Sequence, residues 1–210
     1  MHFDIEAVTV CVGMSNVLEK TVGNKKHFKD WVIVTDPMDS STQKLCEEND
    51  IRCVCSERSG VPKTFRKGML INDGLKELGR KAWLLQIDCD ILLPNDFSET
   101  LAKTQLKEDN IYGSKREFVI ENQTDELIEE AAQKDKRWGI YILGYFQLFH
   151  SNRENTYPES SIDCSHDDLE FQQRWHDSQR TYLPLQVKHL GLPFNKESWA
   201  GKKIDLIRMI

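Results

Sequence analysis

Short runs of apolar and β-branched residues alternate with segments of helical spacing through the first half of the chain. The apolar runs cover residues 7–13, 30–36, 51–56 and 81–88, and the helical segments cover residues 16–22, 40–49 and 64–79. Alternation at this pitch is typical of right-handed βαβ units, in which successive strands run parallel. The sequence therefore predicts an α/β fold with a Rossmann-like, mainly parallel mixed central sheet flanked by helices.

The second half of the chain is less regular. Strand-like segments at 110–121, 139–150 and 182–191 accompany a helical segment at 165–175. No repeat, low-complexity tract or linker interrupts the 210 residues, a length that suits one well-buried domain. We expect a single domain over residues 1–210, whose two halves share one sheet.

Composition argues against several classes of function. The formal net charge of −6 argues against binding of nucleic acid or an anionic membrane through a broad positively charged surface. No apolar run approaches the roughly 18 residues of a membrane span, and the N-terminus lacks the pattern of a secretory signal. The six cysteines match no zinc-ligand spacing. We expect a cytoplasmic protein with reduced thiols and no transmembrane segment.

Two acids follow the fourth apolar run, in the stretch "WLLQIDCDILLPNDF" that begins at Trp83. Asp88 and Asp90 lie one residue apart, and side chains at this spacing on an extended chain point to the same side. Two like charges so close repel each other unless a cation lies between them or one is protonated. Carboxylate oxygens suit Mg²⁺ or Mn²⁺. The alternative is that both acids only make a loop polar.

Six segments, in order, resemble motifs of the GT-A fold glycosyltransferases, the large inverting family that uses nucleotide-diphospho-sugars. The segments are "VTVCVGMSNVLEKTV", "DWVIVTDPMDSSTQKLCEENDI", "KGMLINDGLKEL", "QIDCDILLP", "DDLEFQQRW" and "VKHLG". The third looks closest to the galactosyl- and N-acetylgalactosaminyl-transferring branch. One departure is "VGMSN" in the first loop, where that family usually has a P-x-Y/F-N turn.

The resemblance implies an inverting, metal-dependent glycosyltransferase. A nucleotide-sugar-binding half, about 1–93, would bind the donor, in particular a UDP-sugar, and an acceptor-side half, about 94–210, would bind a glycan or another hydroxyl acceptor. It assigns catalysis to Asp168 and Asp167; Mn²⁺ or Mg²⁺ binding to Asp90, Asp88 and His189; nucleotide binding to Val12, Gly13, Asp36, Lys67, Asn72 and Asp88; and acceptor binding to Asp167 and Trp138.

Local structure offers plainer interpretations of some of these residues. Ser165 and Asp168 have the S-x-x-D spacing of a helix capping box. Asp36 could form a turn before Pro37, and His189 could be an ordinary strand histidine. Two other functions stay open for the whole chain. One is a non-catalytic nucleotide-sugar-binding module of the same fold, and the more distant one is a nucleotidyltransferase.

Overall fold

The computed structural model describes residues 4–60, 65–80, 83–119, 141–152, 156–159 and 167–190. The strands are β1 (Ile5–Val10), β2 (Asp30–Thr35), β3 (Arg52–Cys55), β4 (Trp83–Ile87), β5 (Ile91–Leu92), β6 (Ile111–Val119), β7 (Phe146–His150) and β8 (Arg180–Leu190). The helices are α1 (Ser15–Thr21), α2 (Ser40–Glu48), α3 (Lys67–Glu77), α4 (Phe97–Lys103) and α6 (Asp167–Gln172), with short 3₁₀ segments η1 (Val22–His27), η2 (Glu57–Ser59) and η3 (Asp177–Gln179).

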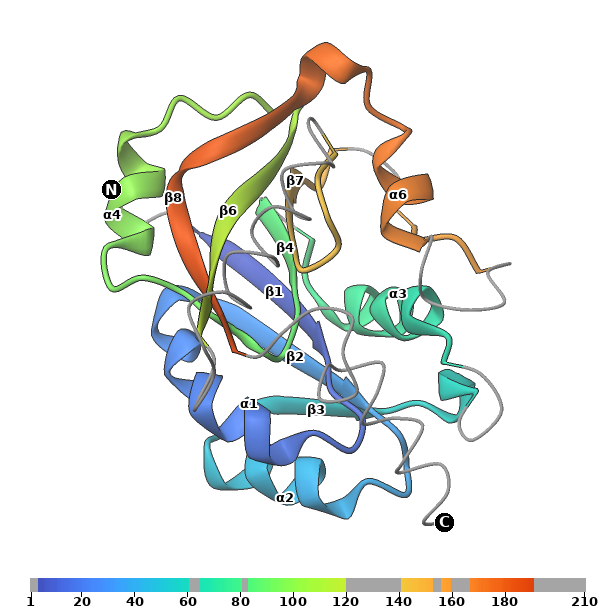
Figure 1. The fold of residues 1–210 in the computed structure, drawn as a ribbon. Coiled ribbons are helices and arrows are strands. Elements are labelled where there is room, and N and C mark those ends of the chain that lie inside the picture. The colour runs from blue at the N-terminus through green and yellow to red at the C-terminus, as the bar shows by residue number, and fades with distance from the viewer. Residues whose placement is uncertain are drawn as a thin grey trace.

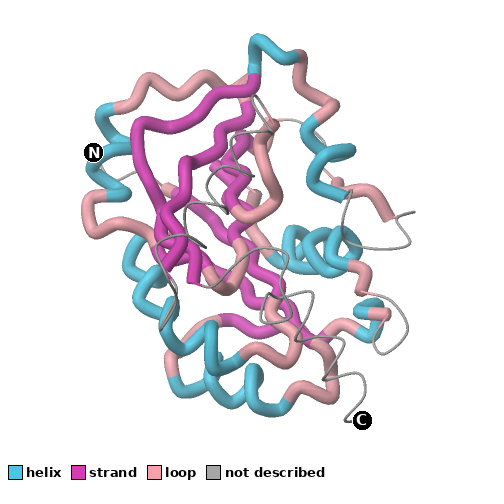
Figure 2. Tube along the Cα trace, in the orientation of Figure 1, coloured by secondary structure: helices cyan, strands magenta, loops and turns pink. Residues whose placement is uncertain are grey.

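All eight strands form one curved sheet in the order β3-β2-β1-β4-β7-β6-β8-β5 (Figures 1 and 2). The pairs β3–β2, β2–β1 and β1–β4 are parallel, as the alternating first half predicts. Strand β7 then pairs antiparallel with both β4 and β6, and β8 runs parallel to β6 but antiparallel to β5. The sheet is therefore mixed, and its parallel part is formed by the N-terminal strands.

The N-terminal strands are apolar on both faces, because a separate core covers each face. In β1, Ile5 and Ala7 join the core that also contains Leu18 of α1 and Cys46 of α2, while Val8 joins the core that contains the buried face of α3. This arrangement explains why these strands read as continuous apolar runs rather than as alternating ones. Figure 1 shows α3 and α6 apart from α1 and α2.

Helix α3 lies unusually close to the sheet because its residue 74 is glycine. A Cβ at Gly74 would overlap Val8 Cγ2 and would lie 2.7 Å from Val34 Cγ2. Gly74 thus allows α3 to pack closely against the sheet. The first residue of this helix, Lys67, lies at the carboxyl end of the neighbouring strands.

Several local predictions need correction. The apolar segment 139–150 is strand only from Phe146 to His150 among its described residues. Helix α2 is capped by Asp39, whose side chain accepts the Thr42 N–H. The five described cysteines are free. Within the described part of the chain, no helix is long and apolar enough to span a membrane.

Candidate functional site

The backbone turns immediately after β4, so Asp88 and Asp90 do not lie on one extended strand. Strand β4 ends at Ile87, and the Ile91 N–H donates to the Asp88 carbonyl at 3.2 Å across the turn. The extended backbone that we expected at 88–90 is therefore wrong. The two carboxylates have different partners: Lys67 Nζ lies 2.5 Å from Asp88 Oδ1, and His189 Nε2 lies 3.0 Å from Asp90 Oδ2.

A cluster of four residues forms around the first residue of α3; we call Lys67, Asp88, Gly144 and Asp168 the Lys67 cluster. Besides its ion pair with Asp88, Lys67 Nζ donates to the Gly144 carbonyl at 3.1 Å. The Gly144 N–H donates to Asp168 Oδ2 at 2.6 Å. Gly144 therefore connects the lysine that was predicted to bind nucleotide with the predicted catalytic base, although the three segments are far apart in sequence.

The electrostatic surroundings of Asp168 favour its protonated form. Burial raises the pKa of the Asp168 carboxyl above its ordinary value, and the negative charge of Asp88 acts in the same direction. Lys67 and the Gly144 N–H oppose this shift but do not cancel it. A carboxylate with a raised pKa is a stronger base, which suits it to accept a proton near neutral pH.

Asp167, the neighbour of Asp168, has its carboxylate at the start of α3. Its Oδ2 accepts the Gly68 N–H at 2.9 Å, and its side chain is buried. An acid at this place satisfies one free N–H of the first turn and interacts favourably with the helix dipole. Asp167 thereby holds α6 against α3, whose own N-cap, Arg66, provides no side-chain hydrogen bond.

Asp90 and His189 form a buried pair beside the Lys67 cluster. Burial raises the pKa of Asp90, but the adjoining His189 and the positive charge of Lys67 act together in the opposite direction and hold it below its ordinary value. Arg116 Nη1 lies 3.3 Å from His189 Nδ1, and its guanidinium stacks over the ring of Tyr145 at 4.2 Å. A guanidinium only donates hydrogen bonds, so Nδ1 is the accepting nitrogen and Nε2 carries the hydrogen that Asp90 accepts.

This pair fits a divalent cation in part. Asp90 Oδ1 is buried and has no hydrogen-bond partner among the described residues, so one oxygen is available. Carboxylate and imidazole are suitable donors for Mn²⁺. However, metal-bound histidine normally presents its other N–H to an acceptor, whereas Nδ1 here faces Arg116.

The described protein side chains would not complete a metal site alone. Among the described residues, no three histidine, cysteine, aspartate or glutamate side chains are arranged to enclose an ion. Mg²⁺ and Mn²⁺ commonly take one or two protein carboxylates and complete their shell with substrate phosphates and water. We therefore regard Asp90 as the residue that fits a cation best, with His189 beside it once Arg116 is turned from Nδ1.

The other predicted nucleotide-binding residues have partners outside the Lys67 cluster. The Asn72 carboxamide accepts the Tyr157 N–H at 2.7 Å and donates to the Tyr157 carbonyl at 2.9 Å, so it ties α3 to segment 156–159. Asp36 accepts hydrogen bonds from Ser59 Oγ and from the Met38 N–H, as a turn aspartate would. The Val12 side chain is buried in the core on the α3 face. Trp138 lies outside the described residues.

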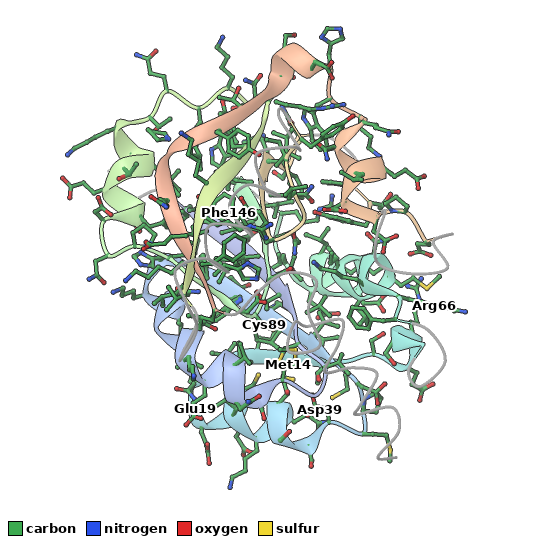
Figure 3. The ribbon with its side chains drawn as sticks, viewed as in Figure 1. Met14, Glu19, Asp39, Arg66, Cys89 and Phe146 are labelled. Carbon is green, nitrogen blue, oxygen red and sulfur yellow. The ribbon has the colours of Figure 1, made fainter. Side chains whose placement is uncertain are left out.

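Asp39 is a structurally important acid that our sequence analysis missed. The residue, labelled in Figure 3, accepts the Gly13 N–H at 2.6 Å and the Thr35 hydroxyl at 3.0 Å. Burial raises its pKa, but hydrogen bonds from Gly13, Thr42 and Ser41 hold it below the ordinary value. Asp39 thus joins the loops that follow β1 and β2. The signal was available, because an aspartate before "SST" is a preferred N-cap.

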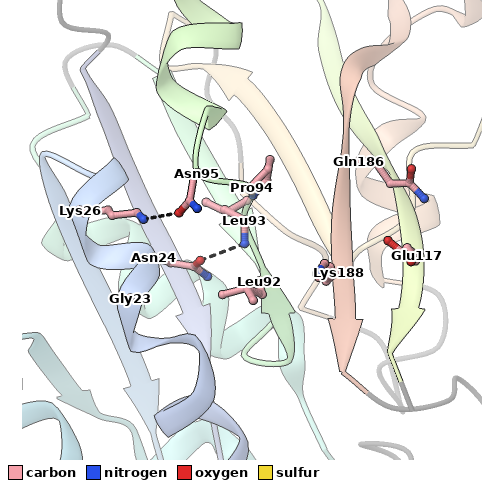
Figure 4. Close-up of a pocket in the computed structure, with 10 residues that line it drawn as sticks. All are labelled: Gly23, Asn24, Lys26, Leu92, Leu93, Pro94, Asn95, Glu117, Gln186 and Lys188. Atoms are coloured by element: carbon pink, nitrogen blue, oxygen red, sulfur yellow. Dashed lines mark hydrogen bonds between the residues drawn. The ribbon is translucent and has the colours of Figure 1, made fainter. Parts of the chain in front are cut away.

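A pocket of about 470 Å³ opens between η1, segment 92–95 and strands β6 and β8 (Figure 4). Lys26, Glu117 and Lys188 contribute its charged walls, and none of the described site residues lines it. Neighbouring side chains on a strand point to opposite faces. Because Lys188 precedes His189, the pocket lies on the other face of β8 and is separate from the candidate site.

The sequence matches no family model and no curated protein. The structure, however, is similar to glucosyl-3-phosphoglycerate synthase from Mycobacterium tuberculosis, solved with Mn²⁺, UDP-glucose and phosphoglyceric acid, with a TM-score of 0.62 and 13% identity over 98% of this chain and 78% of that chain. The chain has a GT-A glycosyltransferase fold. Mannosyl-3-phosphoglycerate synthase from Rubrobacter xylanophilus is also similar, with a TM-score of 0.60 and 11% identity over 99% of this chain and 70% of that chain.

These similarities establish the GT-A fold and give no support to the galactosyl- and N-acetylgalactosaminyl-transferring branch that the third motif suggested. The two similar structures are named as a glucosyl- and a mannosyl-3-phosphoglycerate synthase. Within that motif, Asn72 is hydrogen-bonded to Tyr157 and Gly74 packs closely against Val8, so both residues have structural contacts here. The branch prediction is therefore withdrawn.

Proposed function

We propose that the chain is a metal-dependent glycosyltransferase that moves a sugar, with inversion, from a nucleotide-diphospho-sugar to an acceptor hydroxyl. The observation that carries the proposal is the Lys67 cluster. It brings a lysine and a partly buried aspartate of raised pKa together around Gly144, beside a second carboxylate, at the carboxyl end of β4. Ligands bind at the carboxyl ends of strands in open α/β sheets.

The donor diphosphate would lie between Lys67 and the Asp90–His189 pair. Lys67 has three N–H donors, which can pair with phosphate oxygens as a point charge. Asp90, with Asp88 and His189 nearby, would hold Mn²⁺ or Mg²⁺. A bound divalent cation supplies Lewis-acid stabilisation of the negative charge that grows on the leaving diphosphate. The protein contributes the fixed carboxylates and an orientation of the donor that favours attack.

Asp168 would act as the general base. Its Oδ2 is oriented by the Gly144 N–H, and the carboxylate would take the proton of the acceptor hydroxyl as that oxygen attacks the anomeric carbon and the diphosphate leaves. Asp167 was predicted to share this work and to bind the acceptor. Its hydrogen bond to Gly68 supports a positioning role, in which it fixes the start of α6 so that Asp168 faces Gly144.

The first donor to test is UDP-glucose and the first acceptor is 3-phosphoglycerate, because both occur with similar structures. A thermal-shift screen of nucleoside diphosphates and their sugars, with Mn²⁺ or with chelator, identifies the base and the metal requirement together. A ligand at about 100 times its Kd adds about 2.7 kcal/mol to the stability of the native state. For a chain of this size, that raises the Tm by roughly 5–11 °C.

Turnover distinguishes the enzyme from a non-catalytic binding module. We expect Asp168→Asn to bind UDP as wild type does and to transfer sugar roughly 10²–10⁴-fold more slowly, while the exposed helical change Glu47→Gln leaves both unchanged. Because the pKa of Asp168 is raised, activity should decline on acidification at a higher pH than an ordinary aspartate would give. Binding without transfer or hydrolysis across the donor panel would contradict the proposal and favour the module.

A further inference from the structure

Two buried glutamines lie opposite each other in the strands next to the Lys67 cluster. Gln86 of β4 and Gln147 of β7 are partners in the antiparallel pair, and neither side chain is exposed to solvent. They share a face of the sheet with Leu84 and Phe149 of the core on the α3 side, because side chains alternate along a strand. Gln86 Nε2 donates to Asp88 Oδ1, a member of the cluster, at 2.9 Å. Burying an amide costs free energy unless its polar atoms are hydrogen-bonded, so the partners of the second glutamine indicate its role.

The bonds of Gln147 join the two segments whose contact orients the predicted base. Its Nε2 donates to the Ile142 carbonyl at 2.8 Å and to the Asp168 carbonyl at 3.3 Å. Ile142 lies two residues before Gly144, whose N–H donates to Asp168 Oδ2. One buried amide thus connects the backbone on both sides of the hydrogen bond between Gly144 and Asp168.

Gln172 makes a second connection between the same two segments. It is the last residue of α6 and is fully buried, and its Oε1 accepts the Ile142 N–H at 2.7 Å. Both backbone groups of Ile142 are therefore bonded to a glutamine. Gln172 attaches the end of α6 to this residue, whereas Gln147 attaches the first turn, so the two side chains hold the helix at both ends.

Tyr157 fixes the orientation of the Gln147 amide. Its hydroxyl donates to Gln147 Oε1, and its ring stacks on that of Phe171 in α6, with the ring centroids 3.8 Å apart. Burial, and next the negative charge of Asp168, raise the pKa of Tyr157 well above its ordinary value, so the hydroxyl stays protonated and is the donor of this bond. The amide oxygen therefore faces Tyr157, and Nε2 faces the two carbonyls.

We propose that Gln147, oriented by Tyr157, is a positioning residue for Asp168 in the proposed sugar transfer. This role rests on the proposed function, in which Asp168 takes the proton of the acceptor hydroxyl. Gln147 would contact neither donor nor acceptor. It fixes the backbone of the first turn of α6, so that the carboxylate stays on the Gly144 N–H. A fully bonded network of buried polar groups rigidifies the segments that it joins.

Loss of this network should lower the rate of transfer more than the affinity for the donor. A displacement of about 1 Å at a reacting group can cost about 10²-fold in rate. Within the described part of the chain, the partners of Gln147 do not include Lys67 or Asp90, which would hold the donor diphosphate and its cation. A side chain that only stabilised the fold would lower the Tm and leave kcat per folded molecule unchanged. The split between kcat and KM therefore distinguishes positioning from stability.

Two variants remove the hydrogen bonds and keep the packing. Gln147→Met has a similar length and volume but no amide, and Tyr157→Phe keeps the ring that stacks on Phe171. We expect each variant to lower kcat by roughly 10–10²-fold, with the donor KM within a few-fold of wild type. The double variant should be no slower than Gln147→Met alone, because the hydroxyl acts only through the amide and the effects of residues in one network do not add.

Hydrogen exchange of the Gly144 amide gives a readout that does not depend on turnover. The N–H is bonded to Asp168 Oδ2, so both variants should lose protection at this amide beyond the loss that their lower global stability explains. Tyr112→Phe is the matched control, because its buried hydroxyl accepts the Lys107 N–H and its ring lies in the other core. It should lower the Tm and leave both kcat and the relative protection of Gly144 unchanged.

The positioning role and the proposed function fail through different results. If the wild-type protein transfers no sugar across the donor panel, the proposed function fails, and amide exchange still decides whether Gln147 holds the carboxylate on Gly144. If the wild type is active and Gln147→Met retains its kcat, or if both variants keep wild-type protection at Gly144, the positioning role is overturned and the proposed function stands. An additive loss in the double variant, or an equal loss of kcat in Tyr112→Phe, would also overturn it. If Gln147→Met does not fold, Tyr157→Phe decides by the same readouts.

Discussion

Gly144 offers a direct test of the proposed base, because any side chain there displaces Asp168. A Cβ at residue 144 would lie 2.5 Å from Asp168 Cβ and 2.8 Å from its Oδ2. Ordinary contacts begin near 3.4 Å, so the two residues must move apart by roughly 1 Å. The crowded atom is the Cβ of Asp168 and cannot rotate away, which means that the start of α6 itself must shift.

Two effects of Gly144→Ala can be estimated. Forcing an extra methyl group into a packed site costs about 1–3 kcal/mol, which lowers the Tm of a chain of this size by roughly 2–12 °C. A displacement of about 1 Å at the reacting groups can cost about 10²-fold in rate. We expect transfer to fall about 10²-fold while UDP binding changes only a few-fold, because the Gly144 carbonyl can still accept from Lys67.

Matched glycine variants distinguish a specific loss of transfer activity from a loss of stability. Gly23→Ala should be silent, because nothing lies within 4 Å of a Cβ at that position. Gly74→Ala should lower the Tm without a specific loss of transfer per folded molecule, since it crowds only Val8 and Val34. Steady-state kinetics and scanning fluorimetry on the three variants provide both readouts. A Gly144→Ala protein with wild-type transfer would refute Asp168 as the base held by Gly144.

Three further outcomes are expected. Asp90→Asn keeps an acceptor for His189 but loses the charge, and should abolish the Mn²⁺ dependence of the UDP thermal shift; an unchanged chelator effect would place the metal elsewhere. Asp167→Asn should lower stability by about 0.3–2 kcal/mol through the weakened interaction with the N-terminus of α3, measured by urea unfolding. His27 has a pKa lowered chiefly by burial and by Lys26, so stability should decline as pH falls below about 6.5, the unfolded value, and His27→Phe should flatten that decline.

The sequence predicted the strands and helices of the N-terminal half because their patterns are local. Apolar runs covered on both faces, such as β1 and β4, are recognisable without knowledge of their neighbours. The antiparallel pairing of β7 with β4 is different, since those strands are far apart in the chain and nothing local specifies their pairing. The same limit applied to the turn at 88–90, where the bond between the Asp88 N–H and the Tyr145 carbonyl comes from a distant segment.

The site was predicted through resemblance more than through local pattern. Asp90 and His189 are paired as side chains from distant segments, and no periodicity links them. The hydrogen bond between Asp167 and the first turn of α3 could not be predicted either, because its donor is the backbone N–H of Gly68 and not a charged side chain. Asp39 could have been predicted as a cap, but its hydrogen bond to Gly13 depends on the parallel register of β1 and β2.

Under the proposed function, the ion pair between Lys67 and Asp88 would make donor binding an exchange of partners. In the free protein the lysine ammonium is already neutralised by a carboxylate at 2.5 Å, so a diphosphate would replace Asp88 at Nζ and not meet an unpaired cation. Few solution ions would be released in such an exchange. The affinity for UDP should then depend only weakly on ionic strength, unlike that of a site made of exposed lysines, where screening by salt weakens attraction directly.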